Sequence, residues 1–175
     1  MHDQHGTESQ FVIDHGWRPG VTGALIELQA KYYATHHGFG HGFEAALCSG
    51  LGEFLSSYDP ARDRLLHAWT DGDCVGGLAV DGVSAPAQDA DAKLRWFIVA
   101  PSRQQRGIGH TLMHEALSFC SEVGHHTVLL ETFRGLDAAL LLYERHGFKL
   151  QSEAETTRWG PPVMEQVFMR KTALV

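Results

Sequence analysis

The sequence is poor in cysteine, and the few cysteines it has are scattered. Its 175 residues include three, Cys48, Cys74 and Cys120. No two of them form a Cys-x-x-Cys pair, and an odd, dispersed set offers no disulfide framework. The pattern argues against a disulfide scaffold. We expect three small, buried, apolar side chains in a reducing compartment, which indicates the cytoplasm.

Basic residues and long apolar runs are also scarce. The chain has 14 Lys and Arg against 21 Asp and Glu, which gives a net charge of −7. An acidic surface disfavours nucleic acid as a partner and mildly favours a cationic substrate. No apolar run reaches membrane-spanning length, and the polar start of the chain has no signal-peptide core. We expect no nucleic-acid or membrane partner, a flexible tail at 1–10 and a single domain at 11–175.

Hydrophobic periodicity predicts a chain of interleaved helices and strands. Helical spacing covers 22–35, 43–57, 107–123 and 136–145. Strands are expected at 11–14, 65–70, 74–81, 94–99, 127–132, 148–158 and 163–170. The segment 94–99 is almost continuously apolar, as in a central strand covered on both faces.

The order of these elements predicts a mixed α/β sheet with helices on both faces. A helix separates the strands 94–99 and 127–132, which indicates a parallel pair. Asp71-Gly72-Asp73 is a turn signal that makes 65–81 a hairpin, so the outer strands are expected to be antiparallel. A sheet edge near 163–170 would allow a homodimer.

A glycine-containing segment, Gln104 to Gly109, joins the central strand to a helix. Helix N-termini carry unpaired N–H groups and partial positive charge, and glycine lets an anion approach the backbone closely. These features suit a pyrophosphate, although a Gly-x-Gly turn can also simply start a helix. Leu112 breaks the dinucleotide fingerprint, and the Gly-Lys-Ser/Thr of a Walker loop is absent. A nicotinamide-dinucleotide site is therefore disfavoured.

Two segments resemble the GNAT family of acetyl-CoA-dependent N-acyltransferases. The first, VAPSRQQRGIGHTL, resembles motif A of that family through Val99, Pro101, Gln104, Gly107 and Gly109. The second, AALLLYERHGF, resembles the family's Ala-x-x-x-Tyr-Glu-x-x-Gly-Phe helix through Ala139, Tyr143, Glu144, Gly147 and Phe148. The resemblance covers nearly the whole chain. Segments such as YYATHHGFGHGFE further resemble GNAT domains fused to MarR-type regulators.

The resemblance implies a mostly antiparallel sheet with a central, splayed parallel pair, and acetyl-CoA as co-substrate. Backbone amides of motif A would hold the CoA pyrophosphate, and the end of the preceding strand would pair with the pantetheine arm. The cofactor-binding residues implied are Phe97, Ile98, Val99, Gln104, Gln105, Arg106, Gly107, Ile108, Gly109, His110, Thr111, Thr132 and Ala139. Leu136 stands where the family commonly has an Asn that contacts the cofactor; Thr132 or the 133–135 backbone would have to replace it.

The resemblance also implies catalytic roles. Tyr143 occupies the family's general-acid position, from which it would protonate the departing CoA thiolate; core packing is its alternative role. The strand 94–99 lacks the carboxylate that the family often uses as general base. Glu131, on the next strand, is the first candidate, and a structural carboxylate is an equal alternative. A primary amine would attack acetyl-CoA directly in a ternary complex. The alternative function is a non-catalytic acyl-CoA-binding sensor or scaffold.

The acceptor would be a small-molecule or peptide amine of open identity. In GNAT-like proteins the connection between the first two helices borders the acceptor site. Candidate lining residues are Tyr33, His37, Phe39 and Trp96. Three histidines lie in this connection, His36, His37 and His41, without a nearby Cys or Asp and without the spacing of a closed zinc site. We therefore expect no metal.

Overall fold

The structure, a computed structural model, describes residues 10–82 and 90–172. Its helices are α1 (Val21–His37), α2 (His41–Ser56), α3 (Ile108–Glu122) and α4 (Asp137–Arg145), with a short 3₁₀ turn at Pro101–Arg103. Its strands are β1 (Val12–His15), β2 (Arg64–Thr70), β3 (Asp73–Asp81), β4 (Ala92–Val99), β5 (Thr127–Phe133), β6 (Lys149–Thr156) and β7 (Val163–Lys171). Every predicted element is confirmed, with ends shifted by one or two residues. The predicted tail lies almost wholly outside the described residues.

The strands form one seven-stranded sheet in the order β1-β2-β3-β4-β5-β7-β6. Among the strands of the described residues, only β4 and β5 run parallel, and every other neighbouring pair is antiparallel. The predicted mixed sheet, mostly antiparallel with a central parallel pair, is thus confirmed. The predicted edge near 163–170 is wrong, because β7 lies between β5 and β6 and has both of its sides paired.

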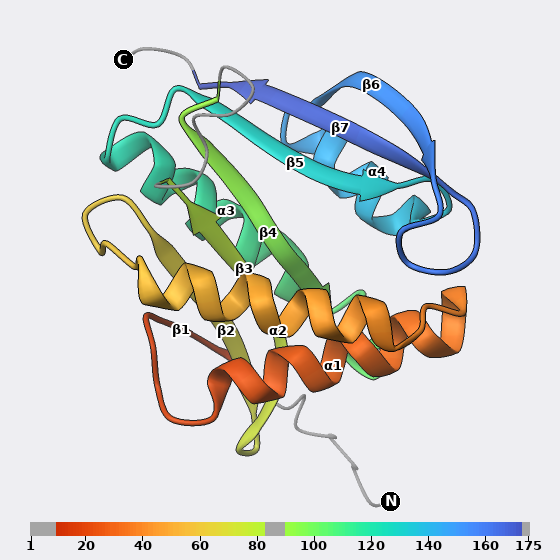
Figure 1. The fold of residues 1–175 in the computed structure, drawn as a ribbon. Helices are drawn as coiled ribbons and strands as arrows, with labels where there is room; N and C mark the ends of the chain where they lie inside the picture. The colour runs from red at the N-terminus through yellow and green to blue at the C-terminus, as the bar shows by residue number, and fades with distance from the viewer. Residues whose placement is uncertain (1–9, 83–89, 173–175) are drawn as a thin grey trace, which may run out of the picture.

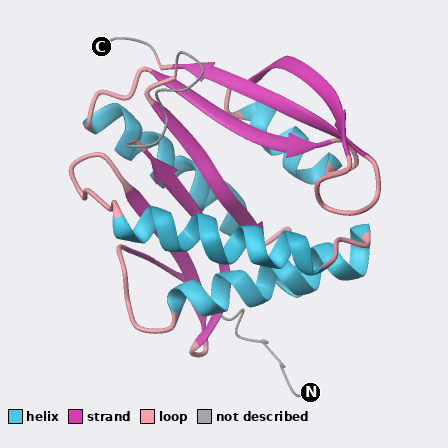
Figure 2. Cartoon of the chain, in the orientation of Figure 1, coloured by secondary structure: helices cyan, strands magenta, loops and turns pink. Residues whose placement is uncertain are grey.

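Helices cover both faces of the sheet (Figures 1 and 2). In this view α1 and α2 cross in front of the strands, and α3 and α4 lie behind them. The front core joins the apolar stripe of α1 and α2 to the sheet through Val21, Leu25, Phe54, Leu65, Ala79 and Ile98. The rear core is larger and is built around the predicted stripe of α3, Ile108, Leu112, Ala116 and Cys120, which is fully buried. Burial of these stripes fixes the helices against the sheet.

The parallel pair separates halfway along its length. β4 and β5 are paired at Ala92, Lys93 and Leu94 and at no later residue. Figure 1 shows the two strands side by side at one end and diverging toward the other. The burial expected along 94–99 is therefore interrupted, since the residues from Arg95 to Phe97 are only half-buried. Backbone and side chains that a neighbouring strand would normally cover are left facing a space inside the fold.

A β-bulge accompanies this separation. Gly77 of β3 pairs with Ile98, and Ala79 pairs with Arg95, so β4 has an extra residue at this point. Trp96 takes a positive φ of 55°, which is rare for a residue with a side chain. Bulges bend a strand and redirect its side chains. The bulge thus accounts for the way β4 turns from β5 toward α1 and α2.

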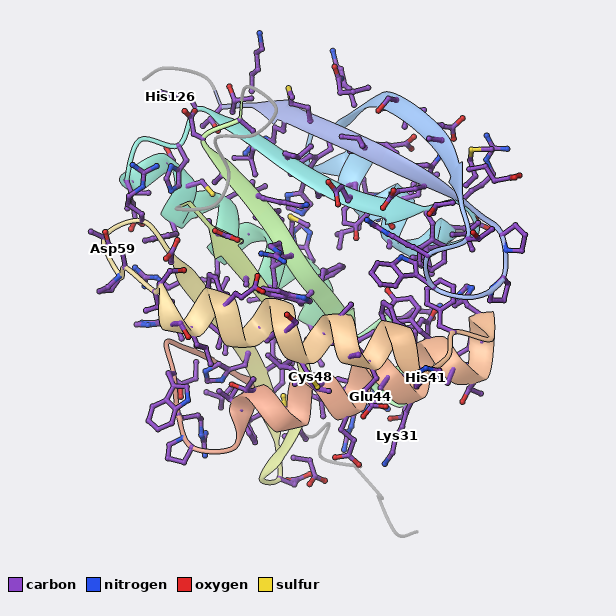
Figure 3. The ribbon with its side chains drawn as sticks, in the orientation of Figure 1. Lys31, His41, Glu44, Cys48, Asp59 and His126 are labelled. Atoms are coloured by element: carbon purple, nitrogen blue, oxygen red, sulfur yellow. The ribbon has the colours of Figure 1, made fainter. Side chains whose placement is uncertain are left out.

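The surface of α2 gives one further correction. Cys74 is half-buried and Cys120 buried, but Cys48 is exposed, so the expectation of three buried cysteines is wrong for it. Figure 3 labels Cys48 with His41 and Glu44 on the outward side of α2.

Within the described ranges, no helix is both long and apolar enough to cross a bilayer.

Candidate active site

The loop between β4 and α3 is held in a defined curve. Gln105 and Gly107 both have positive φ, of 61° and 84°. The Gln104 side chain donates from Nε2 to the carbonyl of Val99 at 3.2 Å, which ties the loop to the end of β4. Successive residues of this conformation turn backbone N–H groups toward a common concave side, where anions bind.

The start of α3 adds unpaired donors to that concave side. The N–H of Thr111 donates to the carbonyl of Gly107 at 2.9 Å, and the amides at 108–110 precede it in the first turn. Such amides have no partner within a helix. Gly109 faces Phe97 closely, since a Cβ atom there would lie 3.2 Å from the ring carbon Cζ. A side chain at Gly109 would crowd Phe97, so the packing of α3 against β4 requires this glycine. The amides of the first turn are the feature that suits a phosphate-bearing group.

A cavity of about 530 Å³ opens in front of this loop, and we call it the loop cavity. The end of β4, the loop 103–110 and one side of α4 line it. Nine predicted cofactor-binding residues line it, namely Phe97, Ile98, Val99, Gln104, Gln105, Gly107, Gly109, His110 and Ala139. Leu136, at the start of α4, also lines it.

Four predicted cofactor-binding side chains do not line the loop cavity. Ile108 is 2% exposed and belongs to the rear core. Thr111 donates its hydroxyl to the carbonyl of Gly107 at 3.1 Å. Arg106 is exposed on the outside of the loop, and Thr132 lines a second cavity. At the first three positions, any contact with a phosphate would come from the backbone.

The second cavity, of about 350 Å³, occupies the space between the diverging strands, and we call it the strand cavity. Residues of α1, α2, β4, β5, α4 and β7 line it, together with the segment between β6 and β7. Tyr33, Phe97 and Tyr143 line both cavities. The two spaces therefore meet at these three rings, with the loop on one side and the separated strands on the other.

Tyr143 lies at this junction. It projects from α4 into the rear core, is 6% exposed and packs near Phe97, Phe148 and Phe168. Burial raises the pKa of the Tyr143 phenol strongly, and nearby Tyr33 adds to the rise, while a hydrogen bond with the Thr132 side chain opposes it. The phenol therefore keeps its proton at neutral pH. Tyr143 combines core packing with a hydroxyl placed between the two cavities.

Glu131 lines the strand cavity from β5, as its candidate role requires. Its carboxylate accepts from the Lys93 ammonium of β4 at 2.8 Å, and each side chain is about one-quarter exposed. The side chains reach toward one another where the strands begin to separate. This geometry fits the predicted role of Glu131 as a base, and it equally fits a structural ion pair.

The predicted acceptor residues are only partly brought together. Tyr33 and Trp96 line the strand cavity, whereas His37 and Phe39 do not. Phe39 is 4% exposed and stacks on Tyr33 with ring centroids 5.6 Å apart, and His37 packs edge-on against Phe133 at 5.0 Å. The two residues support the aromatic wall from outside the cavity, because both rings pack against Phe133 at the end of β5.

Several lining residues lie outside the set predicted from the sequence. Gln29, Lys93, Arg95, Phe133 and Arg158 all face the strand cavity. Gln29 had a readable signal, because it follows Val21 and Leu25 at intervals of four on the buried stripe of α1. A polar residue on such a stripe needs a partner. Arg158 carries no such signal, because only the tertiary fold brings its loop over the cavity.

In the part of the chain that the structure describes, no group of three or more His, Cys, Asp or Glu side chains is arranged to hold a metal ion.

Comparison with known proteins identifies the family of the chain. The model of the acetyltransferase (GNAT) family matches residues 24–148, which is most of the chain. The chain belongs to the acetyltransferase (GNAT) family. The matched residues run from α1 to just beyond the end of α4 and include most of the residues that line the two cavities. No curated protein sequence matches significantly, and the narrower resemblance to domains fused to MarR-type regulators stays a prediction.

Solved structures share the fold at low sequence identity. The ribosomal-protein-alanine N-acetyltransferase of Brucella melitensis is 17% identical with a TM-score of 0.72, over 92% of this chain and 99% of that one. The ribosomal-protein-S18-alanine N-acetyltransferase of Escherichia coli is 18% identical with a TM-score of 0.67, over 95% and 96%. A Salmonella typhimurium protein assigned as an acetyltransferase, solved with its cofactor acetyl-CoA, is 13% identical with a TM-score of 0.68, over 92% and 93%. At these identities the likeness establishes the fold of this GNAT protein.

Proposed function

We propose that this GNAT protein transfers an acetyl group from acetyl-CoA to a primary amine, by direct attack in a ternary complex. The main support is the meeting of the two cavities at Tyr33, Phe97 and Tyr143. One cavity has a loop suited to phosphate, and the other has aromatic walls and charged groups suited to an amine. Two substrates bound in them would meet beside one buried hydroxyl.

The loop cavity would hold acetyl-CoA, which supplies the acetyl group as a thioester. The amides of the 105–110 loop would bind its pyrophosphate, and the unpaired end of β4 would bind the pantetheine arm through backbone groups near Ile98. The positive φ of Gln105 and Gly107 supports this assignment, because this backbone conformation turns N–H groups toward a common concave side. Acetyl-CoA in the structure of the similar Salmonella typhimurium protein is further support.

Tyr143 would act as the general acid. Its Oη proton would pass to the CoA sulfur as the carbon–sulfur bond breaks, which leaves a neutral thiol. A buried phenol is a weak acid, but burial also makes a thiolate more basic. The same fold illustrates this, because burial raises the pKa of the Cys120 thiol to about 12. A thiolate formed inside the cavity is therefore a suitable acceptor for the phenolic proton.

Glu131 is our candidate for the general base. The attacking amine must be neutral and must lose a further proton after the new carbon–nitrogen bond forms, and Glu131 lines the cavity in which it would bind. Its neighbour on β5, Thr132, forms a hydrogen bond with Tyr143, so acid and base would lie on opposite sides of the reacting carbon. The pair with Lys93 orients the carboxylate.

The test is acetyl transfer by purified protein. The protein and acetyl-CoA are incubated with a panel of small amines and of peptides with a free N-terminus. The released CoA thiol is measured with a colorimetric thiol reagent, and each product is identified by mass spectrometry from the added mass of one acetyl group. Acetylation of a primary amine that depends on the protein is the expected result. Binding of acetyl-CoA without transfer to any amine would instead support a non-catalytic acyl-CoA sensor or scaffold.

A further inference from the structure

We propose that the acceptor is an amino acid, whose carboxylate binds Gln29 and Lys93 in the strand cavity while its amine faces Glu131 and Tyr143. This inference rests on the proposed function and narrows its acceptor to a molecule that carries an amine and a carboxylate. It follows from an unpaired buried amide, from the charges that line the cavity and from the geometry of one ion pair.

Gln29 presents a side-chain donor that has no partner in the described part of the chain. The side chain is 3% exposed and lines the strand cavity, and among the described residues its Nε2 has no hydrogen-bond partner. It stands on the buried stripe of α1 between Leu25 and Tyr33. Buried polar groups in folded proteins are rarely left unpaired, and those that are unpaired need an explanation. An acceptor oxygen of a bound ligand would satisfy this amide.

The charges on the cavity wall favour an anionic ligand group over a second cation. Three cationic side chains line it, Lys93, Arg95 and Arg158, against two carboxylates, Glu131 and Glu165. Both carboxylates are already ion-paired, Glu131 with Lys93 and Glu165 with Arg158. Arg95 is likewise paired, with the buried carboxylate of Asp81 at 2.8 Å. An ammonium carries three N–H donors and a guanidinium five, so the two cations paired with Glu131 and Glu165 have more donors than one ion pair each uses. A polyamine would find both lining carboxylates already paired, whereas a ligand carboxylate could accept from the remaining donors.

The ion pair between Lys93 and Glu131 matches the head of an α-amino acid. Its two charges lie 2.8 Å apart on neighbouring strands and point into one cavity. An α-amino acid carries its amine and its carboxylate on the same carbon, so one molecule can place the amine beside Glu131 and the carboxylate beside Lys93. The positive amine of the ligand would thus face the negative Glu131, and its negative carboxylate would face the positive Lys93.

The rest of the cavity suits an apolar side chain of modest size. Tyr33, Phe43, Phe133 and Trp159 supply aromatic walls, with Phe43 and Trp159 edge-to-face at 5.4 Å. The volume of about 350 Å³ is near the lower limit of small-molecule sites and accommodates a single amino acid. We therefore expect leucine, methionine, phenylalanine or tryptophan as the acceptor.

Calorimetry with CoA present tests this independently of turnover. Each of these amino acids is titrated beside its carboxamide and its decarboxylated amine, for example phenylalanine, phenylalaninamide and phenethylamine. At least one free amino acid should bind more than roughly tenfold tighter than both analogues, because hydrogen bonds to a charged group are the strong ones. Equal or tighter binding of the decarboxylated amines, or no binding by any of the free amino acids, would overturn the proposal.

Variants of Gln29 locate the carboxylate. Gln29→Leu keeps the approximate volume without the donor and should weaken binding of the free amino acid roughly tenfold. Gln29→Glu places a negative charge there, so it should weaken the free amino acid further and favour the decarboxylated amine. Gln151→Leu makes the same chemical change on the exposed strand β6 and should leave binding unchanged. Unaltered binding in both Gln29 variants would overturn the assignment.

Folding and function are checked separately. If Gln29→Glu fails to fold, Lys93→Met serves as a second variant, and it should also lose affinity for the free amino acid. The unfolding midpoint is measured for every variant. Carboxylate-selective binding without acetyl transfer would reject the proposed enzyme and retain the amino-acid site. Acetyl transfer to the decarboxylated amines in preference to the amino acids would retain the enzyme and reject the site.

Discussion

Replacement of Tyr143 by Phe separates its two roles. The variant keeps the ring that packs near Phe97, Phe148 and Phe168 and removes only the buried hydroxyl. If Tyr143 is a core residue, the fold loses one hydrogen bond, to Thr132, and catalysis is little affected. If Tyr143 is the general acid, the thiolate must leave without a proton donor.

The two roles predict effects of different size. Loss of one neutral hydrogen bond lowers the free energy of unfolding by about 0.5–1.5 kcal/mol. Loss of general-acid catalysis lowers kcat by about 10²–10⁴-fold, which corresponds to about 2.7–5.4 kcal/mol on the barrier. We therefore expect a folded Tyr143→Phe variant, with kcat reduced at least 100-fold or so and the affinity for acetyl-CoA nearly unchanged.

The assay is steady-state release of CoA thiol, with urea unfolding and acetyl-CoA calorimetry on the same preparations. Thr132→Val is the matched control, because it removes the partner of the phenol and leaves the phenolic proton in place. It should lower kcat far less than Tyr143→Phe does. A Tyr143→Phe enzyme that retains more than about half of the wild-type kcat would refute the acid role, since general-acid groups contribute far more than that.

Two further predictions concern Glu131 and His67. Glu131→Gln should lower kcat by about 10²-fold or more if the carboxylate is the base; retention of kcat with a lower unfolding free energy would show a structural partner of Lys93. His67 is fully buried, donates from Nε2 to the carbonyl of Gly16 at 2.9 Å, and accepts from the Trp69 indole at Nδ1 at 2.6 Å. Burial lowers the pKa of His67 below its ordinary value, so below about pH 6.5 the unfolded state binds a proton first. The free energy of unfolding should therefore fall from pH 7 to pH 5, by up to about 1.4 kcal/mol per pH unit for this one proton. In His67→Gln, the unfolding free energy measured with urea should depend less steeply on pH, and an unchanged pH dependence would contradict the assignment.

The sequence predicted the elements because each is specified locally. The α3 stripe at intervals of four, the turn between β2 and β3, and the positive φ at Gly107 all follow from residues close together in the chain. The loop cavity was largely predictable for the same reason. Its main wall is one strand end, one turn and one helix start, which are consecutive in sequence.

The strand cavity was less predictable because it depends on contacts between distant segments. The register of β4 and β5 decides that pairing stops at Leu94, and the bulge at Trp96 decides which side chains face the opening. Arg158 and Trp159 join the wall only through the path of the chain between β6 and β7. His37 and Phe39 were assigned to the acceptor site because they lie in the connection between the first two helices. Their position in the sequence does not show that their rings pack against Tyr33 outside the cavity.

The central claim is that the loop cavity binds acetyl-CoA. Calorimetric titration of the wild-type protein with acetyl-CoA, NAD and ATP tests it most directly, with Gly109→Val as the comparison, because a side chain there would press on Phe97, Val99 and Leu142, which line the loop cavity. We expect binding of acetyl-CoA alone among the three, weakened at least roughly tenfold in Gly109→Val, a difference of about 1.4 kcal/mol. No binding of acetyl-CoA by the folded wild-type protein, or equal binding of all three ligands, would contradict the account.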